Sequence, residues 1–225
     1  MKSRSIQYFR IILWIGVYSL IITLLVSTGL RLSMLSDFRA THNWPSTSSI
    51  DYKYARYPIM TLAHIIPGAL FILAGVFQFN RTFRNKHPGV HKRIGKFYLL
   101  LGCIIGITAL IMGITFQFGG IVETIAVTLF GLFFLYSLIK AYYYAKKKNF
   151  MMHREWMIRG YSLGLAVATM RPIIGLFFAL TDIAFSIFFG YVFWLAFIPH
   201  ILVAEWWIHY TRKYRKQSLQ NKRAT

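Results

Sequence analysis

The sequence predicts an all-α polytopic membrane protein, a single bundle of six transmembrane helices with both termini on the cytoplasmic side. Of its 225 residues, 56% are hydrophobic and only 14% are charged, against about 25% charged residues in an average soluble domain. The mean hydropathy is +0.50. The apolar residues also gather in six stretches, each near the roughly 20 residues that a helix needs to cross a hydrocarbon core of about 30 Å.

The first of these stretches, 11–30, is expected to be a retained helix. Its apolar run is about twice the usual 7–15 residues of a cleavable signal, and no A-x-A site follows. The segment 31–57, rich in Ser, Thr and Tyr, is expected to be an outer loop. The remaining spans are predicted at 58–79, 94–116, 120–143, 156–180 and 186–209, followed by a basic cytoplasmic tail, 210–225. These elements leave no room for a separate soluble domain, so residues 1–225 form one membrane domain.

The distribution of basic residues predicts the orientation. The chain has 26 Lys and Arg against 6 Asp and Glu, a net charge of +20, which alone would suggest nucleic-acid binding. However, 21 of the 26 lie in 1–10, 80–96, 140–159 and the tail, four lie in 31–57, and the last is Arg171 inside the fifth span. By the positive-inside rule, both termini face the cytoplasm. We therefore expect a multi-pass protein of the cell membrane, with anionic lipids rather than nucleic acid at its cytoplasmic face.

Ionisable groups inside spans are expensive and usually face a bundle interior or a wet cavity. An outer layer of such groups contains His64, Glu123, Arg171 and Asp182. Gly68 and Gly75 share a helix face with His64 and would let another helix approach closely. The simpler interpretations are that Arg171 pairs with Glu123 to clamp two helices and that His64 makes an interhelical hydrogen bond.

An inner layer is richer in groups that handle protons. Its members are Gln78, Arg81, His87, His91, Arg93, Tyr98, His153, Arg154, Arg159, Tyr161, His200 and Glu205. Glu205 is expected to pair with a basic residue of this layer. Our hypothesis is that His64 and Arg171 anchor the outer part of a ligand. His91, Tyr98, His153, Arg159 and Glu205 would then handle charge or protons at the inner part.

The candidate ligands are a quinone, a b-type haem or a similar redox group. A b-type haem takes two axial imidazoles, and the outer layer offers only His64, so at most one haem fits, near His91, His153 or His200. No confident metal-ligand set is present. A quinone needs only a His or Tyr donor, a basic residue and aromatic walls. The single cysteine, Cys103, excludes a disulfide within the chain.

Two other classes of function stay open at this point. One is proton-coupled transport of a small solute, for which buried His, Arg and Glu are typical coupling groups. The other is a non-catalytic assembly protein that binds a membrane-protein partner, or a second copy of itself, through its small-residue faces. Hydrolase motifs, phosphate loops and the H-E-x-x-H zinc motif do not occur in the sequence.

Several ordered motifs resemble those of the bacterial membrane proteins of domain of unknown function 2306. These motifs are His64-x3-Gly68, Gln78-Phe79 with Arg81, the run His91 to Tyr98, the run His153 to Tyr161, Arg171 and Glu205. The resemblance covers roughly residues 58–210. It departs from the family's H-R-x-x-G-x-x-Y element in the placing of one arginine, since this chain reads His91-Lys92-Arg93. The resemblance implies that the costly intramembrane residues are also family motif positions, and it implies no particular ligand.

Overall fold

A computed structural model describes residues 2–41, 45 and 50–223, and in these ranges the regular elements are all helices. The helices are α1 (Lys2–Thr41), α2 (Ile50–Arg56), α3 (Pro58–Phe79), α4 (Arg81–Lys86), α5 (Pro88–Thr115), α6 (Gly120–Lys146), α7 (Phe150–Leu180) and α8 (Phe185–Arg223). Six of them, α1, α3 and α5 to α8, are long and apolar enough to cross a membrane. The all-helical prediction and the number of long apolar helices are thus confirmed.

The helix ends differ from the predicted spans, because a helix does not have to stop where the apolar stretch stops. Only the span 58–79 coincides with its helix. Residues 31–41 and 210–223 contain no Gly or Pro and continue α1 and α8, so the predicted outer loop and tail are partly helical. The helix α5 begins six residues before the predicted span, at Pro88, a residue favoured in the first helical turn. The helix α7 begins after Asn149, whose side chain accepts a hydrogen bond from the Met152 amide at 3.2 Å.

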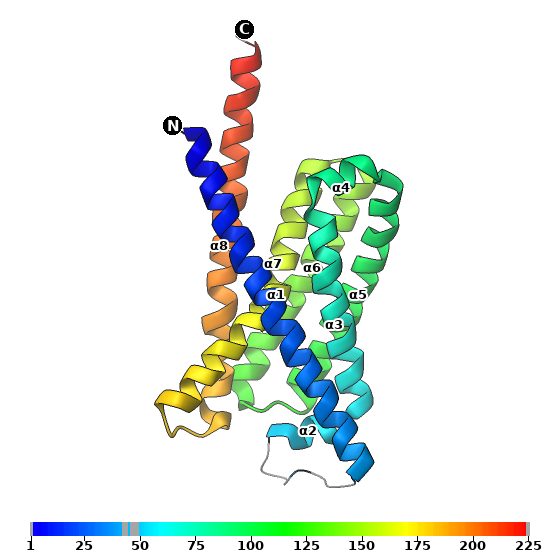
Figure 1. The fold of residues 1–225 in the computed structure, drawn as a ribbon, viewed down its shortest axis with the longest axis vertical. Coiled ribbons are helices and arrows are strands. Elements are labelled where there is room, and N and C mark those ends of the chain that lie inside the picture. The colour runs from blue at the N-terminus through cyan, green and yellow to red at the C-terminus, as the bar shows by residue number, and fades with distance from the viewer. Residues whose placement is uncertain (1, 42–44, 46–49, 224–225) are drawn as a thin grey trace.

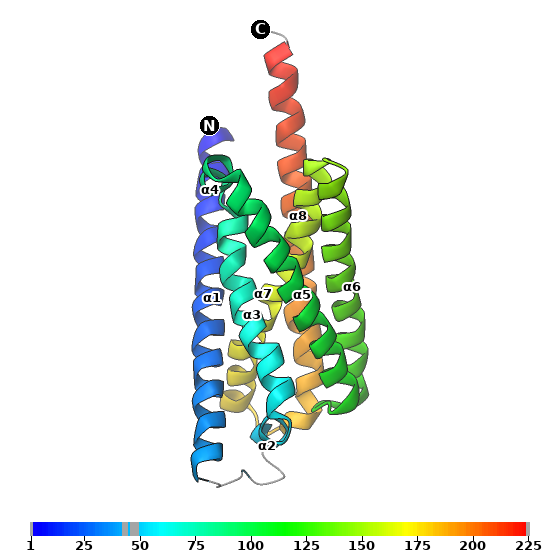
Figure 2. The same ribbon diagram turned by 90° about the vertical axis from the view of Figure 1, so that its right-hand side faces the viewer.

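The six long helices form an elongated bundle (Figures 1 and 2). Both α1 and α8 pack on α7, while α3 packs on α5 and α6 lies against α5, α7 and α8. Both chain ends, α4 and the turn between α6 and α7 lie at one end of the bundle, which we call the terminal end. The short helix α2 lies at the opposite end, the α2 end. In Figure 1, α1 and α8 cross in the half nearer the terminal end and lie farther apart towards the α2 end.

Two glycines on the predicted face of α3 play different parts in this packing. A Cβ atom on Gly75 would lie 2.7 Å from Cζ of Tyr161, so this glycine permits the contact between α3 and α7. Tyr161 then donates a hydrogen bond to the Ile72 carbonyl at 3.0 Å. A Cβ on Gly68 would meet only Ile105, at 3.9 Å. Gly75 therefore serves close helix packing, as expected, whereas Gly68 borders open space.

Candidate functional site

A cavity of about 210 Å³ lies inside the bundle in the half nearer the α2 end. Three of the four outer-layer residues predicted from the sequence, His64, Glu123 and Arg171, line it, and Asp182 does not. The apolar lining of the cavity combines aliphatic side chains and methionines with seven phenylalanines: Phe71, Phe118, Phe130, Phe134, Phe189, Phe193 and Phe197. The cavity is thus lined by one ionisable group from each of α3, α6 and α7, with phenylalanine rings among its apolar lining residues. We call it the outer cavity.

Arg171 has no carboxylate partner within the described part of the chain. The ion pairs there are Arg31–Asp51, Arg159–Glu205 and Arg212–Glu155, so Arg171 and Glu123 do not form the clamp considered above. The Arg171 Nε atom is buried and has no hydrogen-bond partner among those residues. A buried donor without a partner is rare and costly. Arg171 therefore has an unused hydrogen-bond donor beside the outer cavity.

Glu123 is held by backbone groups instead. Glu123 is 4% exposed, and its Oε2 accepts hydrogen bonds from the amides of Phe118 and Gly119, each at 2.6 Å. Both amides belong to the connection between α5 and α6. Such charge-assisted bonds are stronger than neutral ones, so they fix both the carboxylate and the connection at the α2 end.

The His64 ring is oriented by Thr108 of α5. His64 Nδ1 lies 2.9 Å from the Thr108 hydroxyl oxygen, and that hydroxyl donates to the Ile104 carbonyl at 2.8 Å. Because the hydroxyl has only one hydrogen, its oxygen accepts from His64 Nδ1–H. In a neutral ring, Nε2 then carries a lone pair. His64 thus supplies an acceptor to the outer cavity, and Arg171 supplies a donor.

The helix α2 lies at the outer end of the cavity and is fixed on two sides. Arg31 of α1 forms an ion pair with Asp51, and its guanidinium carbon lies 4.1 Å from the Tyr54 ring centroid. On the other side, Lys53 donates a hydrogen bond to the Gln117 carbonyl. Burial raises the pKa of the Tyr54 phenol, although nearby Arg171 and Arg31 act in the opposite direction. The phenol therefore stays protonated at neutral pH and retains its donor.

Arg31 and Tyr54 line the outer cavity and were missed as site residues from the sequence. Both fall in the segment predicted as an outer loop. The available signal was local: the run Ile50–Arg56 contains no Gly or Pro and begins with an acidic residue in its first turn, a pattern that favours a short helix.

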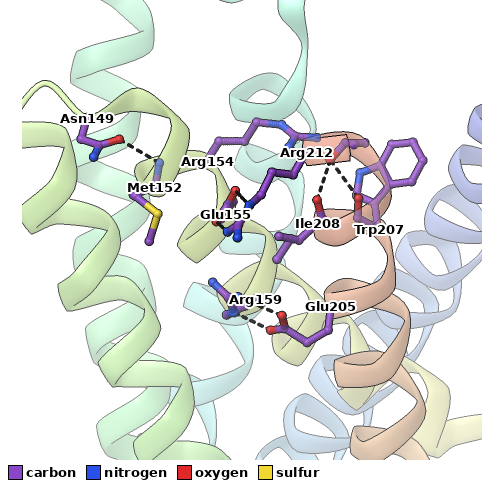
Figure 3. A network of polar contacts seen from close by, with 10 residues as sticks. Asn149, Met152, Arg154, Glu155, Arg159, Glu205, Trp207, Ile208 and Arg212 are labelled. Atoms are coloured by element: carbon purple, nitrogen blue, oxygen red, sulfur yellow. Dashed lines mark hydrogen bonds and ion pairs between the residues drawn. The ribbon is translucent and has the colours of Figure 1, made fainter. Parts of the chain in front are cut away.

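In the inner layer, two arginine–carboxylate pairs join α7 and α8 (Figure 3). As expected, Glu205 pairs with a basic residue, Arg159, through bonds of 2.5 and 2.9 Å. The second pair joins Glu155, which is 2% exposed, to Arg212. Figure 3 shows both pairs bridging the facing sides of the two helices. These charges connect helices and do not meet in a cavity with His64.

Other inner-layer residues make separate contacts between helices. His153 donates from Nδ1 to the Ala141 carbonyl at 2.8 Å, and His200 Nε2 lies 2.8 Å from the Thr169 hydroxyl. Gln78 donates to the His91 carbonyl at 3.3 Å. Tyr98 is fully buried and stacks on Phe71 with ring centroids 4.1 Å apart. The phenol of Tyr98 and Nδ1 of His91 are buried without partners among the described residues.

A second, larger cavity of about 1030 Å³ lies between α1, α4, α7 and α8. We call it the inner groove. Four of the predicted inner-layer residues line it, namely Arg81, Arg154, Tyr161 and His200. The predicted polar residues therefore do not form a single site. Some line the outer cavity, some line the inner groove, and others make contacts between helices. On α1, Leu24 lines the outer cavity and Leu20 lines the groove, about one helical turn away. On α7 the two linings overlap along the chain, since Leu163 and Gly164 line the outer cavity and Leu165 lines the groove.

Each of the two cavities is lined by a single histidine. His64 lines the outer cavity and His200 lines the inner groove. Across the described ranges, no group of three or more His, Cys, Asp or Glu residues is arranged to hold a metal ion. The residues of either cavity therefore do not provide the histidine pair that a b-type haem takes.

Comparison with known proteins gives one match. Residues 61–208 match the family model described as "Predicted membrane protein (DUF2306)". The matched range includes α3 and α5 to α7 almost entirely and most of the apolar part of α8. It also contains all the outer-layer and inner-layer residues predicted from the sequence. No curated protein and no solved structure matches the chain.

Proposed function

The chain belongs to the DUF2306 family of predicted membrane proteins, and we propose that its outer cavity binds the headgroup of a lipid-soluble quinone. The observation that carries the proposal is the buried Arg171 Nε donor, which has no partner among the described residues and lies beside an apolar cavity lined by seven phenylalanines and by His64. A bound carbonyl oxygen would supply the missing acceptor and remove the cost of an unsatisfied donor.

The hydrogen-bonding groups of Arg171 and His64 suit both oxidation states of a quinone. Arg171 donates to a carbonyl oxygen of the oxidised ring, and the lone pair of His64 Nε2 accepts from a hydroxyl of the reduced ring. Phenylalanine walls favour stacking on a flat ring. Ligand pockets usually have volumes of about 300–1,000 Å³, so a space of about 210 Å³ suits a headgroup whose tail lies outside it.

An Arg171→Gln variant is expected to bind a short-chain ubiquinone about tenfold more weakly, because the charged donor is lost. Trp194 serves as a natural reporter, since its ring lies 5.3 Å from that of the cavity residue Phe130. The measurement is quenching of tryptophan fluorescence in the purified full chain, with the dissociation constant obtained by titration.

Arg56→Gln is the matched control, because it removes an exposed arginine near the α2 end that does not line the cavity. It should bind the quinone as the unchanged protein does. Equal binding by Arg171→Gln and the unchanged protein would contradict the quinone proposal. Haem added to the same samples should give no bis-histidine Soret spectrum. Such a spectrum, lost in His91→Ala or His153→Ala, would favour haem instead.

The orientation in the membrane is part of the same proposal. Both chain ends and the Lys- and Arg-rich segments 80–96 and 140–159 are assigned to the cytoplasm by the positive-inside rule. The outer cavity then lies in the outer half of the bilayer. Green fluorescent protein fused after Thr225 should fluoresce in cells, and alkaline phosphatase fused there should be inactive. The reverse pair of results would contradict this orientation.

A further inference from the structure

The inner groove contains an unusual concentration of arginine. Four arginines line it, from three helices: Arg10 of α1, Arg81 and Arg84 of α4, and Arg154 of α7. The lining includes no Asp or Glu. Arginine recognises phosphate through its planar fork of N–H donors, so this set of side chains suits an anionic phosphate group.

Among the described residues, no carboxylate pairs with Arg10, Arg81 or Arg84, whereas Arg154 already has contacts within the protein, one of them to the Thr211 hydroxyl at 3.2 Å. The six acidic residues of the chain are Asp37, Asp51, Glu123, Glu155, Asp182 and Glu205. Glu155 and Glu205 are paired with Arg212 and Arg159, while Asp51 pairs with Arg31 and Glu123 binds backbone amides. Asp37 and Asp182 lie in the sequence at the outer ends of α1 and α7. Arg10, Arg81 and Arg84 are therefore positive charges at the groove without a carboxylate among the described residues, and an anionic ligand would complement them.

Below its arginines the groove is apolar. Leu13, Val17 and Leu20 of α1 line it together with Leu165 and Val203. Arg10 and Leu20 are ten residues apart on one helix, or about 15 Å at 1.5 Å per residue. That length is about half of a 30 Å hydrocarbon core, the depth of one leaflet.

Aromatic side chains place the arginine end at the level of lipid headgroups. Phe9 packs against Trp206 and Trp207, with ring centroids 4.5 and 5.7 Å apart, and Trp207 and Tyr210 line the groove. Tryptophan and tyrosine gather at membrane interfaces. The two ends of the groove thus match the two ends of a lipid in the leaflet at the terminal end.

We propose that the inner groove binds one acidic phospholipid, with its phosphate at Arg10, Arg81, Arg84 and Arg154 and an acyl chain along the apolar part. This site is distinct from the outer cavity and does not depend on quinone binding there. It also goes beyond general attraction of basic residues to an anionic surface, because it specifies one lipid held between α1, α7 and α8.

Native mass spectrometry of the purified full chain tests the stoichiometry and the charge requirement. With dioleoylphosphatidylglycerol as the probe, one lipid should remain bound per chain, at least tenfold more tightly than dioleoylphosphatidylcholine. Arg81→Gln/Arg84→Gln should lose about tenfold in affinity. Lys92→Gln/Lys96→Gln removes the same charge from exposed residues of α5 that do not line the groove, and it should lose less than twofold.

A second variant tests the acyl-chain part without changing charge. Gly16 lines the groove, and a Cβ there would meet nothing within 4 Å, so Gly16→Leu fills the groove without a clash. It should lower phosphatidylglycerol binding about tenfold. Gly29→Leu, equally open on α1 and outside both cavities, should leave binding unchanged. Equal binding of the two lipids, equal losses in variants and controls, or displacement of the lipid by millimolar inorganic phosphate would each overturn the proposal.

Discussion

A Gly190→Ala variant is expected to lower the stability of the protein by about 3 kcal/mol, the upper part of the range for overpacked interiors. Gly190 of α8 lies against the start of α6. A Cβ at this position would lie 2.8 Å from the Glu123 nitrogen and 3.0 Å from the Gly119 oxygen. These neighbours are main-chain atoms, so no side chain can rotate away. The α6–α8 contact would have to open.

The sign of the change in stability distinguishes two causes, because a packing clash lowers the stability whereas the higher helix propensity of alanine raises it. Gly to Ala within a helix stabilises by up to about 1 kcal/mol when nothing is near. Gly29→Ala on α1 is the matched control, because a Cβ there meets nothing within 4 Å. We expect the melting temperature to fall by about 6–12 °C for Gly190→Ala and to stay level or rise for Gly29→Ala. An unchanged or higher melting temperature for Gly190→Ala would contradict the contact.

Gly190→Ala should also disturb the outer cavity where Glu123 lines it. The main chain that Gly190 contacts includes Gly119, whose amide donates to the Glu123 carboxylate.

Melting is measured through the half-buried thiol of Cys103, the only cysteine in the chain, with a dye that fluoresces on reacting with exposed thiols.

Arg212→Ala is expected to destabilise the protein by about 2–3 kcal/mol. Arg212 pairs with Glu155, whose side chain is only 3% exposed. Loss of one partner from a buried ion pair leaves an uncompensated charge and costs about 3–5 kcal/mol. Because the Arg212 side chain is 41% exposed, solvent screening reduces that figure. The melting temperature should fall by about 5–10 °C, measured by Cys103 labelling.

A double variant identifies the cause of that loss. In Arg212→Ala/Glu155→Gln no charge remains buried, so the double variant should recover more than half of the lost stability. Lys213→Ala, at the adjacent exposed position, should change the melting temperature by less than about 1 °C. If the double variant melts no higher than Arg212→Ala alone, the buried charge of Glu155 is not the source of the effect.

Most of the fold was accessible from the sequence, whereas the ends of its helices were not. The six apolar stretches predicted the six long helices because lipid-exposed backbone must form helices. Residues 31–41 and 210–223 were predicted as loop and tail, since hydropathy reports where the membrane ends and not where a helix ends. Helix α2 was missed for the same reason: its seven residues include three charged ones and form no apolar stretch. Tertiary contacts of Asp51 and Lys53 hold this helix.

The candidate site was predicted as a set of residues, and the tertiary structure separated that set. Membrane cost singled out His64, Glu123 and Arg171, which line one cavity. The same criterion also singled out Arg159 and Glu205, which satisfy each other. An ionisable residue inside a membrane has a high energetic cost whether it binds a ligand or another helix, so cost alone does not distinguish the two roles.

The sequence by itself determined the class of the protein, its six long helices, the asymmetry of its basic residues and the short set of polar residues inside the membrane. These features follow from composition and from periodicity along the chain, which are local properties. Only the tertiary structure decided that Arg171 has no carboxylate partner in the described part of the chain and that Arg10, Arg81, Arg84 and Arg154 line one groove. Pairing and enclosure depend on the distances between helices far apart in the chain, and the crossing of those helices is set by packing contacts such as Gly75 against Tyr161.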